Sequence, residues 1–163
     1  MMQVETKVQD GRVDFDFLMG DWKVHNRRLR ERLKGSTSWE EFDGTVTAHP
    51  ILGGLGNFDE VVFNREAGPM LGATLRLFDV ATQEWRIYWA NGSQGELDVP
   101  MIGKFVNGRG VFYAQEPHEG TTIFSRFIWT EISENACRWE QAISSDGGTT
   151  WETNWTGDFT RVW

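Results

Sequence analysis

The stretch FDFLMGDWKV, from Phe15 to Val24, contains the change of pattern that decides the fold. Phe15, Leu18 and Met19 lie three and four positions apart, which is the spacing of a helical turn. Gly20 then ends the turn, because glycine readily adopts backbone angles outside the helical region. From Asp21 onward the pattern is that of short strands, so the sequence predicts one helical turn followed by an all-β domain.

The remainder of the chain consists of short segments rich in β-branched and aromatic residues, separated by turn signals. In one of them Trp85, Ile87 and Trp89 share a face while Arg86 and Tyr88 share the other. Both faces are partly apolar, so the alternation leaves open which face is interior. The predicted strands are Trp22–Arg32, Ser38–Ala48, Asn57–Phe63, Gly72–Asp79, Glu84–Ala90, Leu97–Val106, Gly110–Gln115, Thr121–Ile132, Ala136–Ser144 and Thr150–Arg161.

Short turns such as Asn107–Gly110 and Asp146–Gly148 join neighbouring strands closely enough for hairpins. Consecutive hairpins form a meander, and closing the sheet removes its two bare edges. We therefore predict an all-β fold: a closed or nearly closed antiparallel up-and-down barrel of about ten strands, lipocalin-like, with a short N-terminal helical turn. We expect one domain over residues 1–163, with residues 1–12 as a flexible N-terminus.

Charge and composition exclude several classes of partner. The formal net charge of -8 argues against nucleic acid, whose binding proteins usually carry a basic patch. No segment approaches the ~20 apolar residues of a membrane span, and no signal peptide is recognisable, so we expect a cytoplasmic protein without a membrane partner. The single cysteine, Cys137, is expected to be a buried inert thiol, and no Cys/His cluster has the spacing of a metal site.

Several motifs together carry a family resemblance. Gly20-Asp21-Trp22 matches the Gly-x-Trp triplet of lipocalin-like proteins, and the segments 138–141, 144–155 and 159–161 add to the match. From Phe15 to Arg161 the chain resembles a family of small, mainly bacterial lipocalin-like (calycin) proteins of unknown function, distantly similar to nitrobindins and fatty-acid-binding proteins. The resemblance implies a roughly ten-stranded barrel with Trp22 in its base, and it implies no particular activity.

Nine tryptophans and eleven phenylalanines in a closable meander predict an aromatic-lined cavity. We expect a small hydrophobic or amphipathic ligand inside it, with an arginine or Gln141 fixing a polar end. If Trp22 points inward, alternation also turns Val24, Asn26, Arg28 and Arg30 inward. Pairing of the arginines with Glu60, Glu140 or Glu152 is the structural alternative. The predicted ligand-binding residues are Trp22, Arg28, Arg76, Tyr88, Arg126, Trp139, Gln141 and Trp155.

Three other functions remain open from the sequence. One is an enzyme of the cyclase or isomerase type that uses Glu60, Glu140 or Tyr88 as acid or base. Another is an interaction module whose aromatic residues fill its core and a homodimer interface. The third is nitrobindin-like haem binding through one axial histidine. We expect no cofactor, because no two of His25, His49 and His118 are spaced as a metal pair, and neither His25 nor His118 lies in a stretch that matches the haem ligand.

The segment from Ser144 to Trp151 matches the Asp-box of sialidases and other propeller proteins. Propellers carry this motif in repeated blades, whereas this chain has one copy. We therefore predict a structural hairpin clasp here rather than a sugar-binding site.

Overall fold

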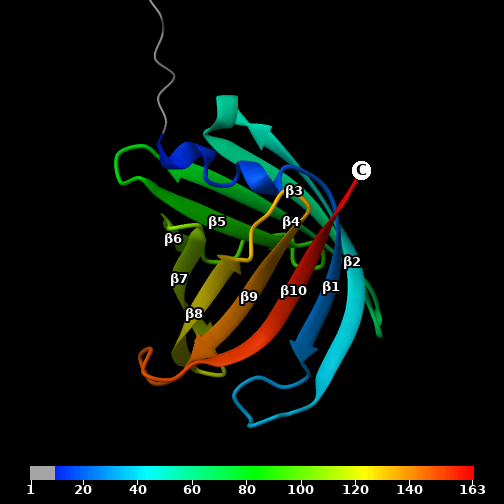
Figure 1. The fold of residues 1–163 in the computed structure, drawn as a ribbon. Coiled ribbons are helices and arrows are strands. Elements are labelled where there is room, and N and C mark those ends of the chain that lie inside the picture. The colour runs from blue at the N-terminus through cyan, green and yellow to red at the C-terminus, as the bar shows by residue number, and fades with distance from the viewer. Residues whose placement is uncertain (1–9) are drawn as a thin grey trace, which may run out of the picture.

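A computed structural model describes residues 10–163, which form one closed antiparallel barrel of ten strands (Figure 1). Every strand pairs with its neighbour in the chain, and β1 pairs with β10 to close the barrel. The predicted all-β up-and-down barrel is confirmed. The strands are β1 (Gly20–Leu29), β2 (Trp39–Ile51), β3 (Gly56–Arg65), β4 (Gly68–Asp79), β5 (Glu84–Asn91), β6 (Met101–Val106), β7 (Arg109–His118), β8 (Thr121–Thr130), β9 (Ala136–Ser144) and β10 (Glu152–Val162).

Side chains along the strands alternate between the interior and the surface. In β2, Phe42, Val46 and Ala48 are buried whereas Thr45 and Thr47 are exposed. This alternation follows from the two-residue period of a strand, and it gives the barrel an apolar interior.

The first residues of the described chain close one end of the barrel with two 3-10 turns, η1 (Gly11–Val13) and η2 (Asp16–Leu18), seen in blue in Figure 1. We call these turns and their apolar side chains the base plug. Phe15 and Leu18 point into the core and are almost completely buried. The predicted helical turn is confirmed. Of the predicted flexible N-terminus, residues 1–9 lie outside the described residues, and Asp10 caps η1.

Trp22 joins the base plug to β1. Its indole Nε1 donates a hydrogen bond of 2.8 Å to the Leu18 carbonyl oxygen, and the Arg161 guanidinium lies 4.2 Å above its ring. Arg161 also donates to the carbonyl oxygens of Phe17 and Met19. Trp22 therefore lies in the base of the barrel, as the Gly-x-Trp resemblance implies.

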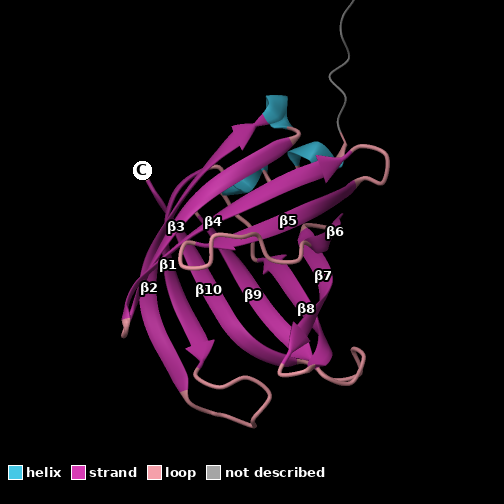
Figure 2. Ribbon diagram, turned by 180° about the vertical axis from the view of Figure 1, so that it is seen from behind, coloured by secondary structure: helices cyan, strands magenta, loops and turns pink. Residues whose placement is uncertain are grey.

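The barrel has one weak seam, between β5 and β6. These strands pair over only three positions, Trp85–Ile87 with Met101–Gly103, whereas the neighbouring pairs are longer. β6 begins at Met101 rather than at the predicted Leu97, because Pro100 has no N–H to donate to a ladder. Residues 92–100 instead form a loop, drawn in pink in Figure 2, that crosses the end of the barrel opposite the base plug.

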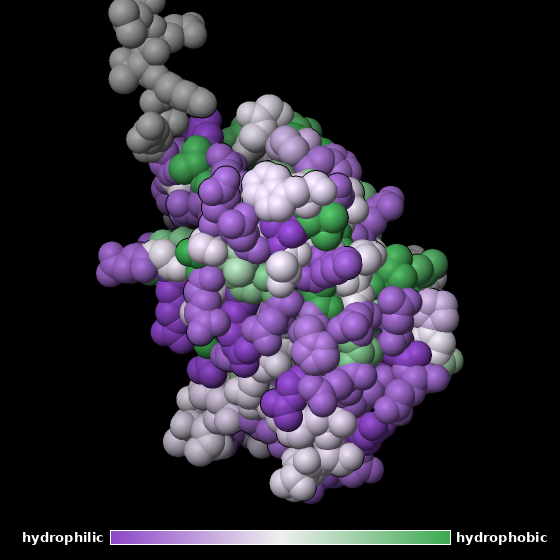
Figure 3. Space-filling view, turned by 45° about the vertical axis from the view of Figure 1, so that its right-hand side comes forward, coloured by the Kyte–Doolittle hydropathy of each residue, from purple (hydrophilic) through white to green (hydrophobic). Residues whose placement is uncertain are grey.

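The outer surface is largely hydrophilic on the face shown in Figure 3, and the hydrophobic side chains there lie in small groups. None of the helices among residues 10–163 is long and apolar enough to cross a membrane.

Candidate functional site

The barrel encloses a cavity of about 330 Å³ to which all ten strands contribute. Its apolar wall is formed by Val24, Val46, Val61, Phe63, Met70, Ile87, Trp89, Val99, Met101, Phe127, Trp129, Trp139, Trp155 and Phe159. A cavity of this size and composition suits one small molecule with aromatic or aliphatic character.

Aromatic rings form a continuous chain around one side of the cavity. Trp139 lies edge-on to Trp155, with ring centroids 5.6 Å apart, and Phe127 meets Trp139 at 5.1 Å. Phe63 continues the chain, with its centroid 5.3 Å from that of Trp155 and 6.2 Å from that of Trp89. These contacts fix the rings against one another, so this side of the cavity is a preformed aromatic wall.

The cavity floor, next to the base plug, carries a buried ion pair. Arg76 Nη2 lies 2.8 Å from Asp59 Oδ2, and its Nη1 donates to Asn57 Oδ1 at 3.0 Å. Asp59 also accepts a hydrogen bond from the Thr74 backbone N–H at 3.0 Å. The Arg76 guanidinium is therefore neutralised by its own partners. Its Nε and the indole Nε1 of Trp129 are buried donors without an acceptor among the described residues.

The opposite end of the cavity, which we call the rim, carries Arg28, which unlike Arg76 has no carboxylate partner among residues 10–163. Arg28 projects from the end of β1, and its guanidinium lies 5.0 Å above the Trp155 ring. Its Nε is buried and finds no acceptor among the described residues. Burial lowers the pKa of Arg28, and the nearby guanidinium groups of Arg65 and Arg32 lower it further.

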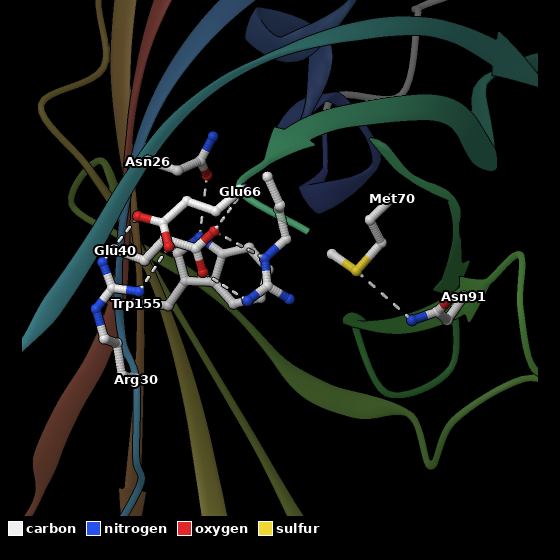
Figure 4. A network of polar contacts seen from close by, with 8 residues as sticks. Asn26, Arg30, Glu40, Glu66, Met70, Asn91 and Trp155 are labelled. Carbon is white, nitrogen blue, oxygen red and sulfur yellow. Dashed lines mark hydrogen bonds and ion pairs between the residues drawn. The ribbon is translucent and has the colours of Figure 1, made fainter. Parts of the chain in front are cut away.

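Two other rim arginines are already paired with carboxylates. Arg65 bonds Glu40 at 2.6 Å, and both nitrogens of the Arg30 fork bond Glu66 at 2.8 Å. Figure 4 shows part of this network, including Asn26, whose Oδ1 accepts a 3.0 Å hydrogen bond from Trp155 Nε1. Across residues 10–163, Arg28 has no carboxylate within ion-pairing distance, and neither has Arg32.

The other side of the rim is acidic. Asp98, from the loop 92–100, and Glu116, from the end of β7, both line the cavity. Burial raises the pKa of Asp98, and the neighbouring carboxylates of Glu116 and Glu96 raise it further. The rim therefore presents arginine on the β1 side and carboxylate on the β5–β7 side.

Five of the eight residues predicted to bind a ligand lie on the cavity wall: Arg28, Arg76, Trp139, Gln141 and Trp155. Their role in binding stays a prediction. Gln141 donates to Asn154 Oδ1 at 3.3 Å, on the neighbouring strand.

The other three predicted residues do not line the cavity. Trp22 lies below it, in contact with the base plug, because β1 starts at that end of the barrel. Tyr88 and Arg126 point outward, since Ile87 and Trp89 in β5 and Ser125 and Phe127 in β8 occupy the inward positions. The guanidinium of Arg126 is stacked 4.3 Å above the Trp151 ring, outside the cavity.

Arg30 also leaves the inward face predicted for it. β1 ends at Leu29 rather than at Arg32, so the alternation stops after Arg28. Arg30 turns toward solvent and pairs with Glu66.

The residues considered for other functions lie outside the cavity wall. Glu60 is exposed on β3, and Glu140 pairs with Arg138 at 3.0 Å on the outer face of β9. His25 lies outside the barrel between Asp43 and Glu41, His49 is exposed, and His118 does not line the cavity. Within the described chain the cavity therefore offers no imidazole for haem iron, and its residues do not fit a haem held by an axial histidine.

Cys137 is buried in the core, where burial raises its pKa to about 12. A thiol with such a pKa carries almost no thiolate near neutral pH. The prediction of a buried inert cysteine agrees with this environment.

The Asp-box segment forms a compact turn outside the barrel interior. Asp146 accepts hydrogen bonds from the backbone N–H and the hydroxyl group of Thr150, and Ser144 Oγ accepts one from the Gly148 N–H at 2.9 Å. Trp151 closes the turn by donating from Nε1 to the Gly148 carbonyl at 3.1 Å. The motif is thus a hairpin clasp, as predicted from its single copy.

Comparison with known proteins supports the fold. The phycobiliprotein lyase CPES from Guillardia theta has a TM-score of 0.59 with 8% identity, and covers 96% of this chain and 99% of the lyase. The barrel EF1p2_mFAP2b, bound to DFHBI, has a TM-score of 0.51 with 13% identity over 94% of this chain and 100% of its own. A fluorescence-activating β-barrel of de novo design has a TM-score of 0.50 with 15% identity over 92% of this chain and 99% of its own. No family model and no curated protein matches the chain.

The sequence interpretation missed three carboxylates of the cavity: Asp59, Asp98 and Glu116. Asp59 carried a usable signal, because in β3 it shares its face with the apolar residues Val61 and Phe63. A carboxylate on an interior face needs a buried partner, which here is Arg76 across the β3–β4 ladder. Asp98 carried no such signal, since it lies in a loop whose course depends on the short β5–β6 pairing.

Proposed function

We propose that this barrel binds a small hydrophobic or amphipathic molecule in its cavity. The observation that carries the proposal is the preformed aromatic wall of Trp89, Trp139 and Trp155 around a 330 Å³ space. An apolar molecule of matching size would exchange water for dispersion contacts with these rings. The solved barrel EF1p2_mFAP2b, bound to DFHBI, is in keeping with a small molecule bound by a protein of this fold.

A neutral fluorescent probe tests the proposal directly. N-phenyl-1-naphthylamine gains fluorescence in an apolar site, and energy transfer from the cavity tryptophans reports its proximity. We expect saturable binding that Trp139→Ala weakens about tenfold, because the variant removes one large ring from the wall.

Trp151→Ala is the matched control, since Trp151 lies on the clasp outside the barrel. It should leave the probe affinity unchanged. Absence of saturable binding, or equal loss in both folded variants, would count against a ligand site in the cavity. A native mass spectrum compared with the denatured mass tests independently for a co-purified small molecule.

A further inference from the structure

Three arginines line the cavity, Arg76 at its floor and Arg28 and Arg32 at its rim, and they differ in their partners. Arg76 at the floor is neutralised by Asp59 at 2.8 Å and satisfied further by Asn57. Arg28 at the rim has neither a carboxylate nor an acceptor for its buried Nε among residues 10–163. Arg28 is half-buried, and its buried Nε lacks an acceptor, so an anionic group that arrives with a ligand would gain a charge-assisted hydrogen bond.

The surroundings of Arg28 hold it in place for such a partner. Its guanidinium lies over the face of the Trp155 ring, and Asn26 fixes that ring through the 3.0 Å bond from Trp155 Nε1. The contact with the ring satisfies none of the N–H groups, and the buried Nε has no acceptor among residues 10–163. The edge of a guanidinium is the part that forms paired hydrogen bonds with a carboxylate or sulfonate.

The charged groups around Arg28 also favour binding of an anion beside it. The carboxylates that could compete for Arg28 on its own side of the rim, Glu40 and Glu66, are held by Arg65 and Arg30. On the opposite side, Asp98 and Glu116 repel an anion. A negatively charged group is therefore favoured on the side of the rim that carries Arg28 and Arg32, although the whole chain carries a net charge of -8. Of these two arginines, Arg28 is the one with a buried Nε that lacks an acceptor.

We propose that the ligand is an amphipathic organic anion whose charged group binds Arg28 at the rim while its apolar body lies against the tryptophan wall. This inference rests on the proposed function, because it assigns a chemical class and an orientation to the same cavity. Arg28, rather than the paired Arg76, is then the residue that recognises the charge.

Two probes with one skeleton test the inference. 8-Anilinonaphthalene-1-sulfonate carries the negative charge, and N-phenyl-1-naphthylamine lacks it. We expect Arg28→Gln to weaken binding of the sulfonate at least tenfold and to change binding of the neutral probe by less than twofold.

Arg27→Gln is the matched control, because it removes the same charge from the neighbouring position of β1, where the exposed side chain does not line the cavity. Its effect on sulfonate binding should stay within about twofold. An unchanged sulfonate affinity in Arg28→Gln, or an equal loss for both probes or in both variants, would overturn the assignment of Arg28.

The two proposals fail in different ways. If the neutral probe binds and responds to Trp139→Ala while Arg28→Gln leaves the sulfonate unaffected, the cavity binds ligands but the anion is misassigned. If neither probe binds the wild-type protein, the proposed function itself is wrong, and the inference falls with it.

Discussion

Asp98 determines the direction in which pH should change anion binding. Burial and the charges of Glu116 and Glu96 raise its pKa above that of an ordinary aspartate, so its carboxylate takes up a proton earlier as the pH falls. Protonation removes one of the negative charges that face the Arg28 side of the rim. We expect the affinity for 8-anilinonaphthalene-1-sulfonate to rise about twofold between pH 7 and pH 5.

The measurement is a fluorescence titration at each pH, with the neutral probe as the reference. Asp98→Asn should bind the sulfonate more tightly than the wild-type protein at pH 7 and should show a flatter pH profile. A variant that retains the full wild-type profile would assign the effect to Glu116 or to another rim group.

The sequence alone predicted the positions of some site residues correctly and of others wrongly. Strand alternation placed Arg28 correctly on the interior face, because only local geometry is needed for that conclusion. It placed Arg30 wrongly, since the end of β1 is set by pairing with β2 and β10. It could not find the stacking of Arg126 on Trp151, because these residues meet only after the clasp has folded beside β8.

At the scale of elements, the hairpin clasp between β9 and β10 makes a pH-dependent contribution to stability. Hydrogen bonds from the hydroxyl group and backbone of Thr150, and from Ser144, lower the pKa of Asp146 to about 2. A carboxylate with a depressed folded-state pKa stabilises the protein above its unfolded pKa, which is near 3.8. The stabilisation is lost as the pH falls through about 2.

Asp146→Ala should therefore lower the melting temperature by a few degrees at pH 7, and the difference from the wild-type protein should shrink toward pH 2. Thermal unfolding followed by circular dichroism measures both effects. Ser145→Ala, at the exposed neighbouring position, is the control and should melt as the wild-type protein does. A difference that stays constant from pH 7 to pH 2 would show that the clasp does not depend on the Asp146 charge.

The elements themselves were largely predictable, and their ends were not. All ten strands were expected from short apolar runs and turn residues, since hairpins depend mainly on nearby sequence. In β5 and β8 both faces carry large apolar side chains, so the interior face became clear only from barrel closure. The segment from Leu97 to Pro100 was predicted as strand, but its place is decided by the three-position β5–β6 seam.

At the scale of the whole molecule, the cavity itself has a cost in stability. A space that side chains could fill forgoes the dispersion contacts that a solid core would make. The barrel keeps this space even though Ser125, a small buried residue on its wall, could be larger. A cavity of 330 Å³ that is not filled by side chains is in keeping with the binding function proposed above.

A larger side chain in the cavity should consequently raise the free energy of unfolding and weaken ligand binding. We expect Ser125→Leu to raise the free energy of unfolding by about 1 kcal/mol, because the added methyl groups bury apolar surface in the space. The same variant should weaken binding of N-phenyl-1-naphthylamine at least tenfold, since the side chain occupies the volume that the probe needs. Denaturant unfolding and probe titration measure the two effects on one sample. Thr45→Leu, on the exposed face of β2, is the control and should leave probe binding unchanged. If Ser125→Leu is stabilised and still binds the probe, the ligand site lies outside this cavity.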